Sequence, residues 1–352
     1  MSVTVVIVNW NSGALLGECL RCLEAQTLRP RRVVVVDNGS SDESAKHAEA
    51  FENVTVDRAG ANLGFAGGNN RALASCDTEF VALLNADAFP EPDWLERLVA
   101  AAKAYPEVAA FGSRQLREGN ADVLDGIGDS YHLSGAVWRA RHGVRQRAED
   151  LVAREIFSPC AAAALFRRQA LVDVGGFDED FFCYVEDVDL GFRLRLAGHK
   201  AMYVPDAVVR HMGSATTGGP RSDFAVYHGH RNLVWAFVKN MPGALFWSLL
   251  PLHLLMNTVA VLVFIGRGQG KVIIRAKRDA VKGLPRMWRK RKQIQAGRVA
   301  TVRAIWRVMD KGFVSDGILR RSRSGGNARV AGQENDRVRN DGYTIWIWRR
   351  TK

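Results

Sequence analysis

The sequence predicts an α/β fold with a mostly parallel central sheet, followed by C-terminal helices that associate with a membrane. Two observations predict the sheet. Strand-like and helix-like segments alternate over the first 110 residues, and the strand-like segments are continuous Val/Ile/Leu runs, as is typical of parallel strands that helices bury on both faces. A third observation predicts the C-terminal helices: a long apolar segment and then a strongly basic one follow residue 240.

The alternation can be followed element by element from the N-terminus. Each predicted strand is an apolar run, and each predicted helix has apolar residues at helical spacing. A strand is expected over 3–10, a helix over 13–26, a strand ending in turn residues over 31–42 and a short helix over 44–52. Residues 55–76 are expected to contain a strand, a Gly/Asn-rich loop and the start of a helix, and residues 79–106 a strand, a polar turn and a long helix. This βαβαβ order predicts parallel pairing.

The middle of the chain is less regular. Residues 111–157 are interpreted as a loop-rich excursion with short strands, on the acceptor side of the sheet. A buried strand, a helix and a Gly-Gly turn are expected over 157–182, a strand over 200–217 and a helix over 223–241. Three regions are therefore predicted: a main domain over 1–240, basic and amphipathic membrane-associated helices over 241–312, and a poorly ordered tail over 313–352.

Composition indicates a folded intracellular protein with excess positive charge. Hydrophobic residues make up 47% of the chain, and the formal net charge is +12. The five cysteines are odd in number and scattered, which is typical of reduced thiols in the cytosol. Cys19 and Cys22 fall in a predicted helix without partner ligands at zinc spacing, so no metal or redox site is expected there. The chain enters a strand directly, so no signal peptide is expected.

Polar side chains follow four predicted strands at the point where each strand ends. They are Asn9-Trp10-Asn11, Asp37-Asn38, the stretch from Asn62 to Asn70, and Asn85 to Asp87. In open parallel sheets, ligands bind outside the carboxyl ends of the strands. One such group alone is typical of an ordinary turn, whereas four at one edge predict a binding site.

The residues at these strand ends indicate a nucleotide and a cation. Asp37 can accept hydrogen bonds from a base edge or a ribose hydroxyl, and Trp10 offers a stacking face. Asp87 lies between an apolar strand and a proline-bracketed turn, where its carboxylate can bind a hard divalent cation that also binds a diphosphate. The alternative for Asp87 is a turn residue that starts a helix. No GxGxxG motif follows the first strand and no Walker lysine loop is present, so dinucleotide and P-loop chemistry are poorly supported.

Six segments, taken in order, resemble the family 2 glycosyltransferases, and most closely the bacterial rhamnosyltransferase-like branch that builds cell-surface polysaccharides. The segments are VIVNWNSGALLGECLRCLEAQT, VVVVDNGSSDES, NLGFAGGNNRAL, LLNADAF, GGFDEDFFCYVEDVDLGFRLRLAGHK and VRHMGSAT. Single segments are weak signals, but the ordered set over residues 1–240 is specific. The resemblance implies a GT-A fold, a nucleotide-diphospho-sugar donor, a divalent metal and inversion at the anomeric carbon.

The resemblance also implies roles for the nucleotide-binding residues. Asp37 would hold the base or the ribose, and Trp10 would lie against the base. The remaining members of the expected nucleotide-binding set are Asn9, Asn62, Gly64 and Asn69.

A metal site is implied in the same way. Asp87 matches the last acid of the family's DxD motif, but Asn85 stands where the first acid would be, so coordination would depend on Asp87 and the diphosphate. His211 matches a histidine that completes the metal shell in some members. The expected cofactor is Mn²⁺ or Mg²⁺, and an imidazole ligand favours Mn²⁺. Without the resemblance, His211 is interpreted as a satisfied strand-end histidine.

Three acids, Glu186, Asp187 and Asp189, precede a helical pattern. By themselves they indicate a helix N-terminus, where carboxylates favour the positive end of the helix dipole. The family's ED motif maps onto Glu186-Asp187, which implies that Asp187 is the catalytic base and that Glu186 orients the acceptor or a loop. Asp189 is expected to cap the helix, and the helix terminus is expected to lower the pKa of Asp187.

Residues 244–265 form a 22-residue apolar segment, close to the ~20 residues that span a bilayer. Between Arg267 and Lys311 there are fifteen Lys or Arg and two acids. Nucleotide sugars are cytosolic, so residues 1–240 should face the cytoplasm, and the basic tract that follows the apolar segment favours the same side. A single transmembrane span would put these two regions on opposite sides of the membrane. We therefore expect the apolar segment to lie in the plane of the membrane or to re-enter it, and in one version of this expectation the helix is broken at Pro251. The basic helices that follow are expected to lie on anionic lipid at the inner face of the membrane. A buried core helix is the alternative, and a nucleic-acid partner is not expected.

The expected activity is transfer of rhamnose from dTDP-rhamnose to a hydroxyl of a polyprenyl-linked glycan. Galactofuranose, glucose and GlcNAc are the alternative donor sugars. A sugar nucleotidyltransferase would need a Gly-rich loop with Arg and Lys after the first strand, and NWNSGALL lacks both basic residues. The alternative of another class is a membrane-tethered nucleotide-binding scaffold without turnover, against which the intact Asp87 and Asp187 argue.

Overall fold

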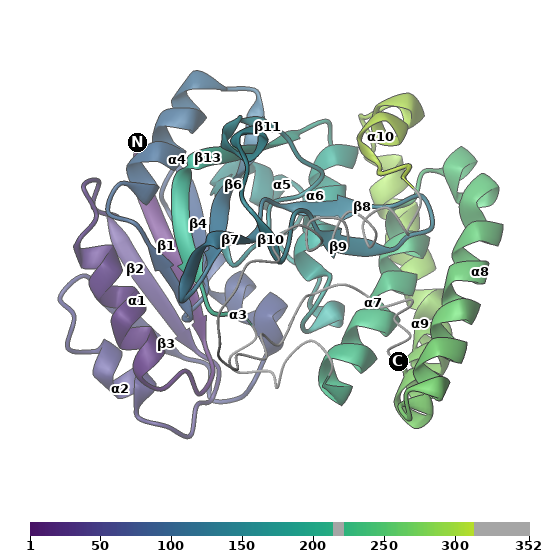
Figure 1. Cartoon of the computed structure of the whole chain (residues 1–352), viewed down its shortest axis with the longest axis horizontal. Coiled ribbons are helices and arrows are strands. Elements are labelled where there is room, and N and C mark those ends of the chain that lie inside the picture. The colour runs from purple at the N-terminus through teal and green to yellow at the C-terminus, as the bar shows by residue number, and fades with distance from the viewer. Residues whose placement is uncertain (214–221, 313–352) are drawn as a thin grey trace, which may run out of the picture.

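A computed structural model of the chain describes residues 1–213 and 222–312. An eleven-stranded sheet lies at its centre, helices cover both faces of this sheet, and a helical bundle packs beside it (Figure 1). The predicted α/β class is confirmed. The tail predicted over 313–352 and the end of the strand predicted over 200–217 lie outside the described residues.

The N-terminal half has the predicted alternation of strands and helices. Its parallel strands are β1 (Val3–Asn9), β2 (Arg32–Asp37), β3 (Val54–Arg58) and β4 (Phe80–Leu84). The helices between and after them are α1 (Ala14–Glu24), α2 (Ser44–Ala48), α3 (Gly64–Leu73) and α4 (Trp94–Ala104). In β1, Val5 and Ile7 pack under α1 and α4, while Val6 packs into the core on the opposite face. Both faces are therefore buried, which explains the uninterrupted apolar run.

The second half of the sheet is mixed. Its strands are β5 (Ala88–Pro90), β6 (Val108–Arg117), β7 (Asn120–Gly126), β10 (Val144–Arg145), β11 (Arg154–Glu155), β12 (Ala163–Arg167) and β13 (Lys200–His211). The strand order is β10-β7-β6-β12-β4-β1-β2-β3, and β13 pairs with β5, β6 and β11. A separate two-stranded sheet contains β8 (Asp129–Tyr131) and β9 (Val137–Arg139). The excursion predicted over 111–157 does contain short strands, but β6 is a ten-residue strand that begins before it.

Two further helices and two short 3₁₀ turns complete this domain. They are α5 (Arg168–Asp173), α6 (Glu186–Leu196), η1 (Ala148–Leu151) and η2 (Glu179–Phe181). Leu190 and Leu194 of α6 pack with α3 and α5 against the face of the sheet opposite α1. The first residues of α6 therefore lie on a helix that the core holds rigidly.

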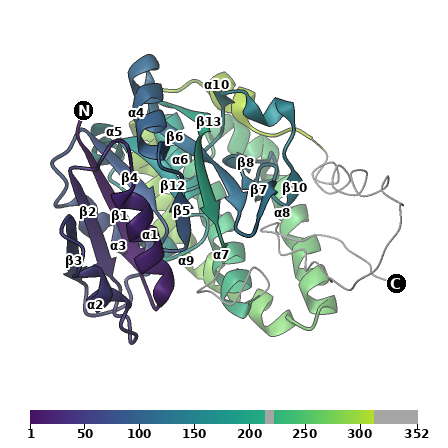
Figure 2. The ribbon, with the colours of Figure 1, turned by 60° about the vertical axis from the view of Figure 1, so that its left-hand side comes forward.

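The C-terminal helices are α7 (Asp223–Asn240), α8 (Gly243–Gly266), α9 (Gly270–Ala296) and α10 (Val302–Val308). Figures 1 and 2 both show this bundle at the end of the molecule away from β3. It shares a core with the sheet domain, in which Trp235 and Phe237 of α7 pack with Tyr131 and Phe192. The boundary predicted after residue 240 coincides with the end of α7, and the division into separate domains stays a prediction.

The apolar segment forms one continuous helix. Pro251 lies inside α8 without ending it, so the predicted form with a break at this residue is wrong. Within the described residues, α8 is the one helix long and apolar enough to cross a membrane. Seven of its residues, from Leu245 to Phe264, are buried against the rest of the protein.

Candidate active site

The carboxyl ends of β1 and β2 bring Asn9 and Asp37 together. The two residues are register partners, and the Asn9 amide lies 3.4 Å from Asp37 Oδ1 and 2.9 Å from Ser44 Oγ. Asp37 Oδ1 also accepts from the Ser40 N–H at 3.2 Å. Both partners are buried, whereas Trp10 is 39% exposed. The edge thus has a fixed carboxylate and an accessible indole ring in neighbouring residues, and their role in binding a nucleotide stays a prediction.

The second nucleotide segment lies at the start of α3. Asn62 Oδ1 accepts from the Gly64 N–H at 2.9 Å, and the Asn38 amide donates to the Gly64 carbonyl at 2.9 Å. Gly64 has φ +73°, and a Cβ on it would lie 2.4 Å from the Phe182 carbonyl oxygen. Only glycine fits here, so the donor-side loop lies directly against the segment that carries the acid cluster. Asn69 is buried and donates to the Phe65 carbonyl within α3; its nucleotide-binding role stays a prediction.

The three predicted metal ligands converge. His211 lies at the end of β13, and its Nε2 is 3.3 Å from Asp87 Oδ1 and 3.4 Å from the Asn85 amide nitrogen. Asp87 and His211 are buried. One carboxylate, one imidazole and one amide is a donor set that suits Mn²⁺ and accepts Mg²⁺. The residues present therefore fit a divalent cation.

A carboxylate that the sequence analysis did not identify, Asp125, contacts the His211 ring on the side away from Asp87. Asp125 Oδ2, at the end of β7, lies 2.8 Å from His211 Nδ1 and 2.5 Å from Arg139 Nη1. Burial disfavours the charged imidazole, but the carboxylates of Asp87 and Asp125 outweigh it and raise the pKa of His211 to about 9. A carboxylate behind a ligating histidine fixes the ring orientation and raises its basicity.

The acid cluster follows a strained segment. Phe182, Tyr184 and Val185 all have φ between 64° and 70°, and Val185 is the residue directly before α6. Non-glycine residues in this region cost of order 1–3 kcal/mol each and persist only when their surroundings enforce them. Asn232, a buried residue of α7, holds the segment in this conformation. Its side-chain amide donates to the carbonyls of Phe181, Cys183 and Tyr184 at 2.8–3.0 Å. Helix α7 thus fixes where α6 begins.

Asp187 and Glu186 have different surroundings at the start of α6. Asp187 is half-buried and accepts from the N–H groups of Ala161 at 3.3 Å and Val188 at 2.8 Å. Glu186 is buried, and its Oε2 has no hydrogen-bond partner among the described residues. Burial raises the pKa of both carboxyls. The expectation that the helix terminus lowers the pKa of Asp187 is therefore wrong, because burial outweighs the dipole and the two N–H donors.

A second missed carboxylate, Asp129 of β8, lies beside Asp187. Ligand atoms of Asp129, Cys160 and Asp187 are all within 4.8 Å of one another. Burial and the charge of Asp187 raise the pKa of Asp129 well above its usual range. Burial also raises the pKa of the Cys160 thiol, to which Arg139 Nη2 donates at 2.7 Å. A raised pKa makes a thiol or a carboxyl harder to deprotonate and so a weaker cation ligand, so we interpret this cluster as the surroundings of Asp187 rather than as a metal site.

Sequence reasoning missed Asp125, Asp129 and Arg139 because they lie in the irregular excursion. A signal was present: the segment LDGIGDSY places two aspartates and two glycines in an apolar stretch. Gly126 is required because a Cβ there would lie 2.3 Å from the Arg139 side chain. Arg139 thus reaches Asp125 behind the metal ligands and Cys160 beside the acid pair.

Asp189 has a structural role, but not the expected one. No side chain caps α6, and the buried Asp189 carboxylate binds Arg193 at 2.9 Å, Lys239 at 2.8 Å and Asn240 at 2.7 Å. The prediction of a helix cap is wrong, because Asp189 lies inside the first turn and faces α7. It connects the helix that carries Asp187 to the C-terminal bundle.

Asp189→Ala is expected to lower the free energy of unfolding by about 3–5 kcal/mol, because it leaves buried Arg193 without its counter-charge and leaves buried Lys239 with Asp178 as its one carboxylate partner in the described structure. Urea unfolding followed by circular dichroism measures this difference. Asp173→Ala, at the exposed C-terminal end of α5, is the matched control and should change the value by less than about 0.5 kcal/mol. A loss below about 1 kcal/mol for Asp189→Ala would contradict the structural assignment.

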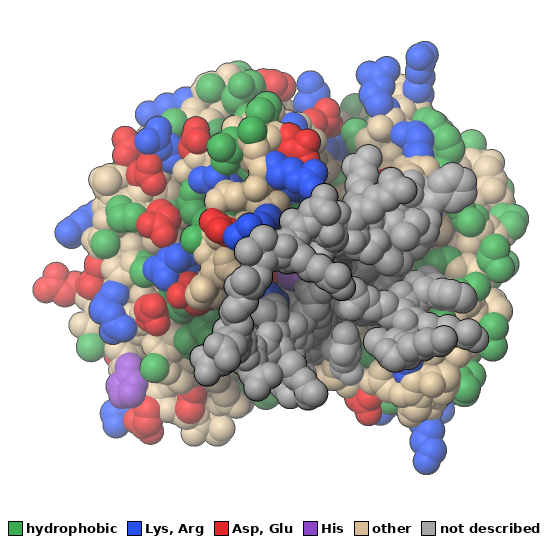
Figure 3. Space-filling view, viewed as in Figure 1, with side chains coloured by type: hydrophobic (Ala, Val, Ile, Leu, Met, Phe, Trp, Pro, Cys, Tyr) green, Lys and Arg blue, Asp and Glu red, His purple; other side chains and the backbone are tan. Residues whose placement is uncertain are grey.

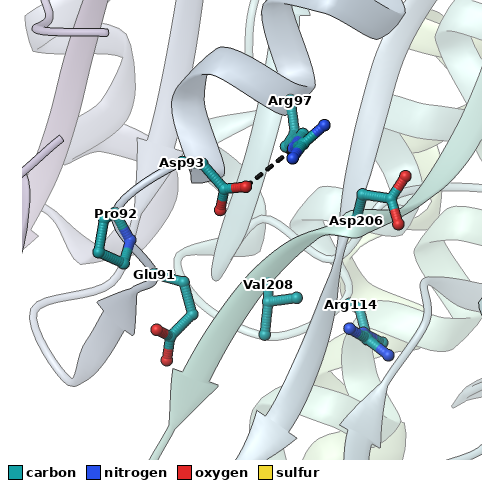
Figure 4. A pocket seen from close by; sticks show the side chains of 7 residues that line it. All are labelled: Glu91, Pro92, Asp93, Arg97, Arg114, Asp206 and Val208. Atoms are coloured by element: carbon teal, nitrogen blue, oxygen red, sulfur yellow. Dashed lines mark hydrogen bonds and ion pairs between the residues drawn. The ribbon is translucent and has the colours of Figure 1, made fainter. Parts of the chain in front are cut away.

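A surface hollow elsewhere on the molecule is distinct from this site. It lies between the start of α4, β6 and β13, and its lining includes Asp93, Arg97, Arg114 and Asp206 (Figure 4). Arg97 is paired with Asp93 at 2.8 Å. None of the predicted site residues lines this hollow.

Comparison with known proteins identifies close relatives of the chain. The sequence model described as "Glycosyl transferase family 2" matches residues 4–175. The N-acetylglucosaminyl-diphospho-decaprenol L-rhamnosyltransferase of Mycobacterium tuberculosis is 32% identical over 248 residues, which cover 64% of this chain and 80% of that protein. The O-antigen chain rhamnosyltransferase RfbN of Salmonella typhimurium is 30% identical over 234 residues, covering 64% of this chain and 70% of that protein.

A solved structure shows the same fold. The mannosyltransferase PcManGT from Pyrobaculum calidifontis, solved with GDP-Man and Mn²⁺, superimposes with a TM-score of 0.51 at 20% sequence identity. The match covers 87% of this chain and 86% of that one. At this identity the likeness shows the fold alone, and it confirms the predicted GT-A architecture.

Proposed function

The chain belongs to glycosyltransferase family 2, and we propose that it transfers rhamnose from dTDP-rhamnose to a hydroxyl of a lipid-linked glycan, with inversion at the anomeric carbon. One observation carries the choice of sugar: relatives at 32% and 30% identity, from two organisms, are both rhamnosyltransferases. The M. tuberculosis relative is named for a diphospho-decaprenol acceptor, which supports a polyprenyl-diphosphate carrier for the acceptor here.

The donor nucleotide is proposed to bind at the carboxyl ends of β1 and β2. Asp37, which accepts from Ser40 and lies beside Asn9, would accept hydrogen bonds from the base or the ribose. The exposed ring of Trp10 supplies a stacking face. The turn at Asn62 and Gly64 would close around the rest of the nucleotide, with Asn69 behind it.

The donor diphosphate is proposed to bind next to Asp87, His211 and Asn85. These residues would hold Mn²⁺ or Mg²⁺, which supplies charge neutralisation for the diphosphate leaving group. Asp125 holds the His211 ring through Nδ1, so that Nε2 points toward Asp87. This orientation would keep the Nε2 nitrogen available, beside the Asp87 carboxylate, to a divalent cation.

Asp187 is proposed to act as the base. As the acceptor oxygen bonds to the anomeric carbon and the bond from that carbon to the diphosphate oxygen breaks, the acceptor's proton moves to the Asp187 carboxylate. The N–H groups of Ala161 and Val188 keep this carboxylate oriented, and its burial makes it a stronger base than a free aspartate. Glu186 is proposed to orient the acceptor.

The enzyme is proposed to work in the cytoplasm, at the inner face of the cell membrane. Its donor is cytosolic and its acceptor is anchored in lipid, so both substrates are available only at that surface. The long apolar helix α8 and the basic helix α9 support this location.

A donor panel tests the proposed function. The full chain is incubated with dTDP-rhamnose, UDP-galactofuranose, UDP-glucose and UDP-GlcNAc, each with a polyprenyl-diphosphate-GlcNAc acceptor and Mn²⁺, Mg²⁺ or chelator, and nucleotide release is measured. We expect release from dTDP-rhamnose at least about tenfold faster than from the other donors, as one missing or misplaced hydrogen bond in a polar site allows. Preference for another donor would overturn the choice of rhamnose, and release from none would favour a nucleotide-binding scaffold.

A further inference from the structure

Helix α8 has two faces of opposite exposure along its whole length. Its buried face runs from Leu245 to Phe264 at three- and four-residue spacing. The opposite face is apolar and open to solvent, with Trp247 65% exposed and Leu262 64% exposed. The other large exposed side chains of this face are Leu254, Leu255 and Ile265. Figure 3 shows hydrophobic side chains along the edge of the molecule where α8 lies.

The outer face of α8 has few polar groups that require hydration. The helix contains no charged residue, and its two exposed hydroxyls already have partners within the helix. Ser248 Oγ donates to the Ala244 carbonyl at 2.8 Å, and Thr258 Oγ1 donates to the Leu254 carbonyl at 3.0 Å. These two hydroxyls can therefore enter an apolar medium without losing a hydrogen bond. The Trp247 carbonyl, which lacks a helical donor because Pro251 has no N–H, and the Trp247 indole N–H would remain at the headgroup boundary.

Helix α9 runs antiparallel to α8 and extends this apolar face. The rings of Phe246 and Trp288 lie 5.6 Å apart, Lys277 Nζ lies 2.5 Å from Asn257 Oδ1, and Phe264 packs with Ile273. The exposed apolar residues of α9 recur at heptad spacing on one side: Ile274, Val281 and Trp288. They line up beside α8, since Trp288 and Phe246 are in contact.

A basic row borders this apolar strip. Lys271, Arg278, Lys282 and Arg289 are all exposed, and their spacing puts them on one line about 80° around α9 from the apolar row at 100° per residue. Among the described residues, Arg278 pairs with Asp279 at 3.1 Å, and Lys282 interacts with the same carboxylate at longer range. No ion pair within 4 Å involves Lys271, Lys282 or Arg289 in the described part of the chain. The other face of α9 is used inside the protein, where Lys290 binds Asp178 and Asp180.

These rows exclude a transmembrane α8. Because the two helices are in contact near both ends, every level of α8 has α9 beside it. A span would therefore carry the Lys and Arg residues of α9 through the bilayer core, where each such residue costs several kcal/mol. A contact in the middle of the helix, between His253 Nδ1 and the Ser134 carbonyl at 2.7 Å, would also draw the sheet domain into the bilayer.

We propose that the outer face of α8 and the Ile274–Val281–Trp288 row of α9 lie in the plane of an anionic bilayer, with the Lys271–Arg278–Lys282–Arg289 row on its headgroups. Charge complementarity favours an anionic bilayer as the partner of this surface, because the apolar strip has basic residues along its edge, as in amphipathic helices that lie on membranes. A second copy of the chain would bring two basic rows to one interface, which like-charge repulsion disfavours. The inference deepens the proposed function by defining the surface through which the enzyme reaches its lipid-linked acceptor.

Vesicle co-sedimentation of the full chain tests the surface without donor or acceptor, so its result does not depend on transferase activity. We expect binding to phosphatidylglycerol-containing vesicles at least about tenfold tighter than to phosphatidylcholine vesicles, and a loss of at least about tenfold in Lys282→Glu/Arg289→Glu. The control Lys103→Glu/Lys200→Glu changes the same charge at exposed sites elsewhere and should lose less than twofold. Equal losses in the two variants, equal binding to the two lipids, or DNA binding without vesicle binding would each overturn the proposal.

Depth measurement distinguishes the in-plane arrangement from a span. Nitroxide labels at positions 247, 254 and 265, which share one side of α8, should all lie at the same depth to within about 5 Å, roughly one helical turn. In a span, the label at 254 would lie about 10 Å deeper than the label at 247, from seven residues at 1.5 Å each. That result would contradict the proposal even if vesicle binding were normal. Normal vesicle binding with no turnover in the donor panel would instead overturn the proposed function alone.

Discussion

Asp187→Asn is expected to lower kcat by about two to four orders of magnitude, the range that a positioned general base contributes. The substitution keeps the shape of the side chain and one of the two oxygens that accept from the N–H groups of Val188 (Oδ1) and Ala161 (Oδ2), so the start of α6 should remain in place with the loss of one hydrogen bond. The variant loses the group that takes the acceptor's proton. Steady-state transfer kinetics measure the effect, and the donor Kd should stay within about threefold because Asp187 does not bind the nucleotide.

The matched control for this prediction is Asp173→Asn. It makes the same chemical change at the exposed end of α5, where the carboxylate accepts only from Gln169 in the described structure, and kcat should be unchanged. If Asp187→Asn kept kcat within about threefold of wild type, the base would have to be another group. Asp129, whose carboxyl lies beside Asp187, would then be the first residue to test.

Asp87→Asn is expected to weaken Mn²⁺ binding by more than the 10–100-fold that loss of an outer-shell partner typically costs, because it removes the charge of a direct ligand. The signal of free Mn²⁺ in electron paramagnetic resonance measures binding without any turnover. Asp125→Asn should fall within the outer-shell range of about 10–100-fold, since Asp125 acts through His211. Comparison of the two variants therefore tests both the metal site and the role of Asp125 in holding His211.

Asp77→Asn is the control for the metal prediction. Asp77 forms a surface pair with Arg31 at 3.3 Å, far more exposed than Asp87, and its loss should leave Mn²⁺ affinity unchanged. Mn²⁺ affinity equal to wild type in Asp87→Asn would contradict the assignment of Asp87, Asn85 and His211. Tight Mn²⁺ binding that instead depended on Cys160 would move the metal to the cluster beside Asp187.

The parts of the site that could be predicted lie on parallel strands. Asn9 and Asp37 end neighbouring strands, and the rule that ligands bind at the carboxyl edge applies to them directly. The apolar runs also predicted which strands are buried, since β1 sends alternate residues into two cores. His211 could be placed beside Asp87 only through the family resemblance, because antiparallel pairing of β13 with β5 brings the two together.

The parts that could not be predicted depend on irregular pairing. Asp125 and Asp129 come from strands joined by glycine turns, and their positions follow from the register of β7 and from the small sheet of β8 and β9. The pKa of Asp187 was mispredicted because the helix N-terminus can be recognised in the sequence, whereas the burial of Asp187 beside Cys160 and Asp129 cannot. The role of Asp189 was mispredicted for the same reason, since its partners Lys239 and Asn240 lie some fifty residues further along the chain.

The anomeric configuration of the transferred sugar tests the central claim most directly. The full chain is supplied with dTDP-rhamnose, Mn²⁺ and a polyprenyl-diphosphate-GlcNAc acceptor, and the product is analysed by NMR. The account predicts one added rhamnose whose configuration is opposite to that of the donor, with no product from Asp187→Asn on the same timescale. A rhamnoside with retained configuration, or no rhamnose transfer alongside efficient transfer of another sugar, would contradict it.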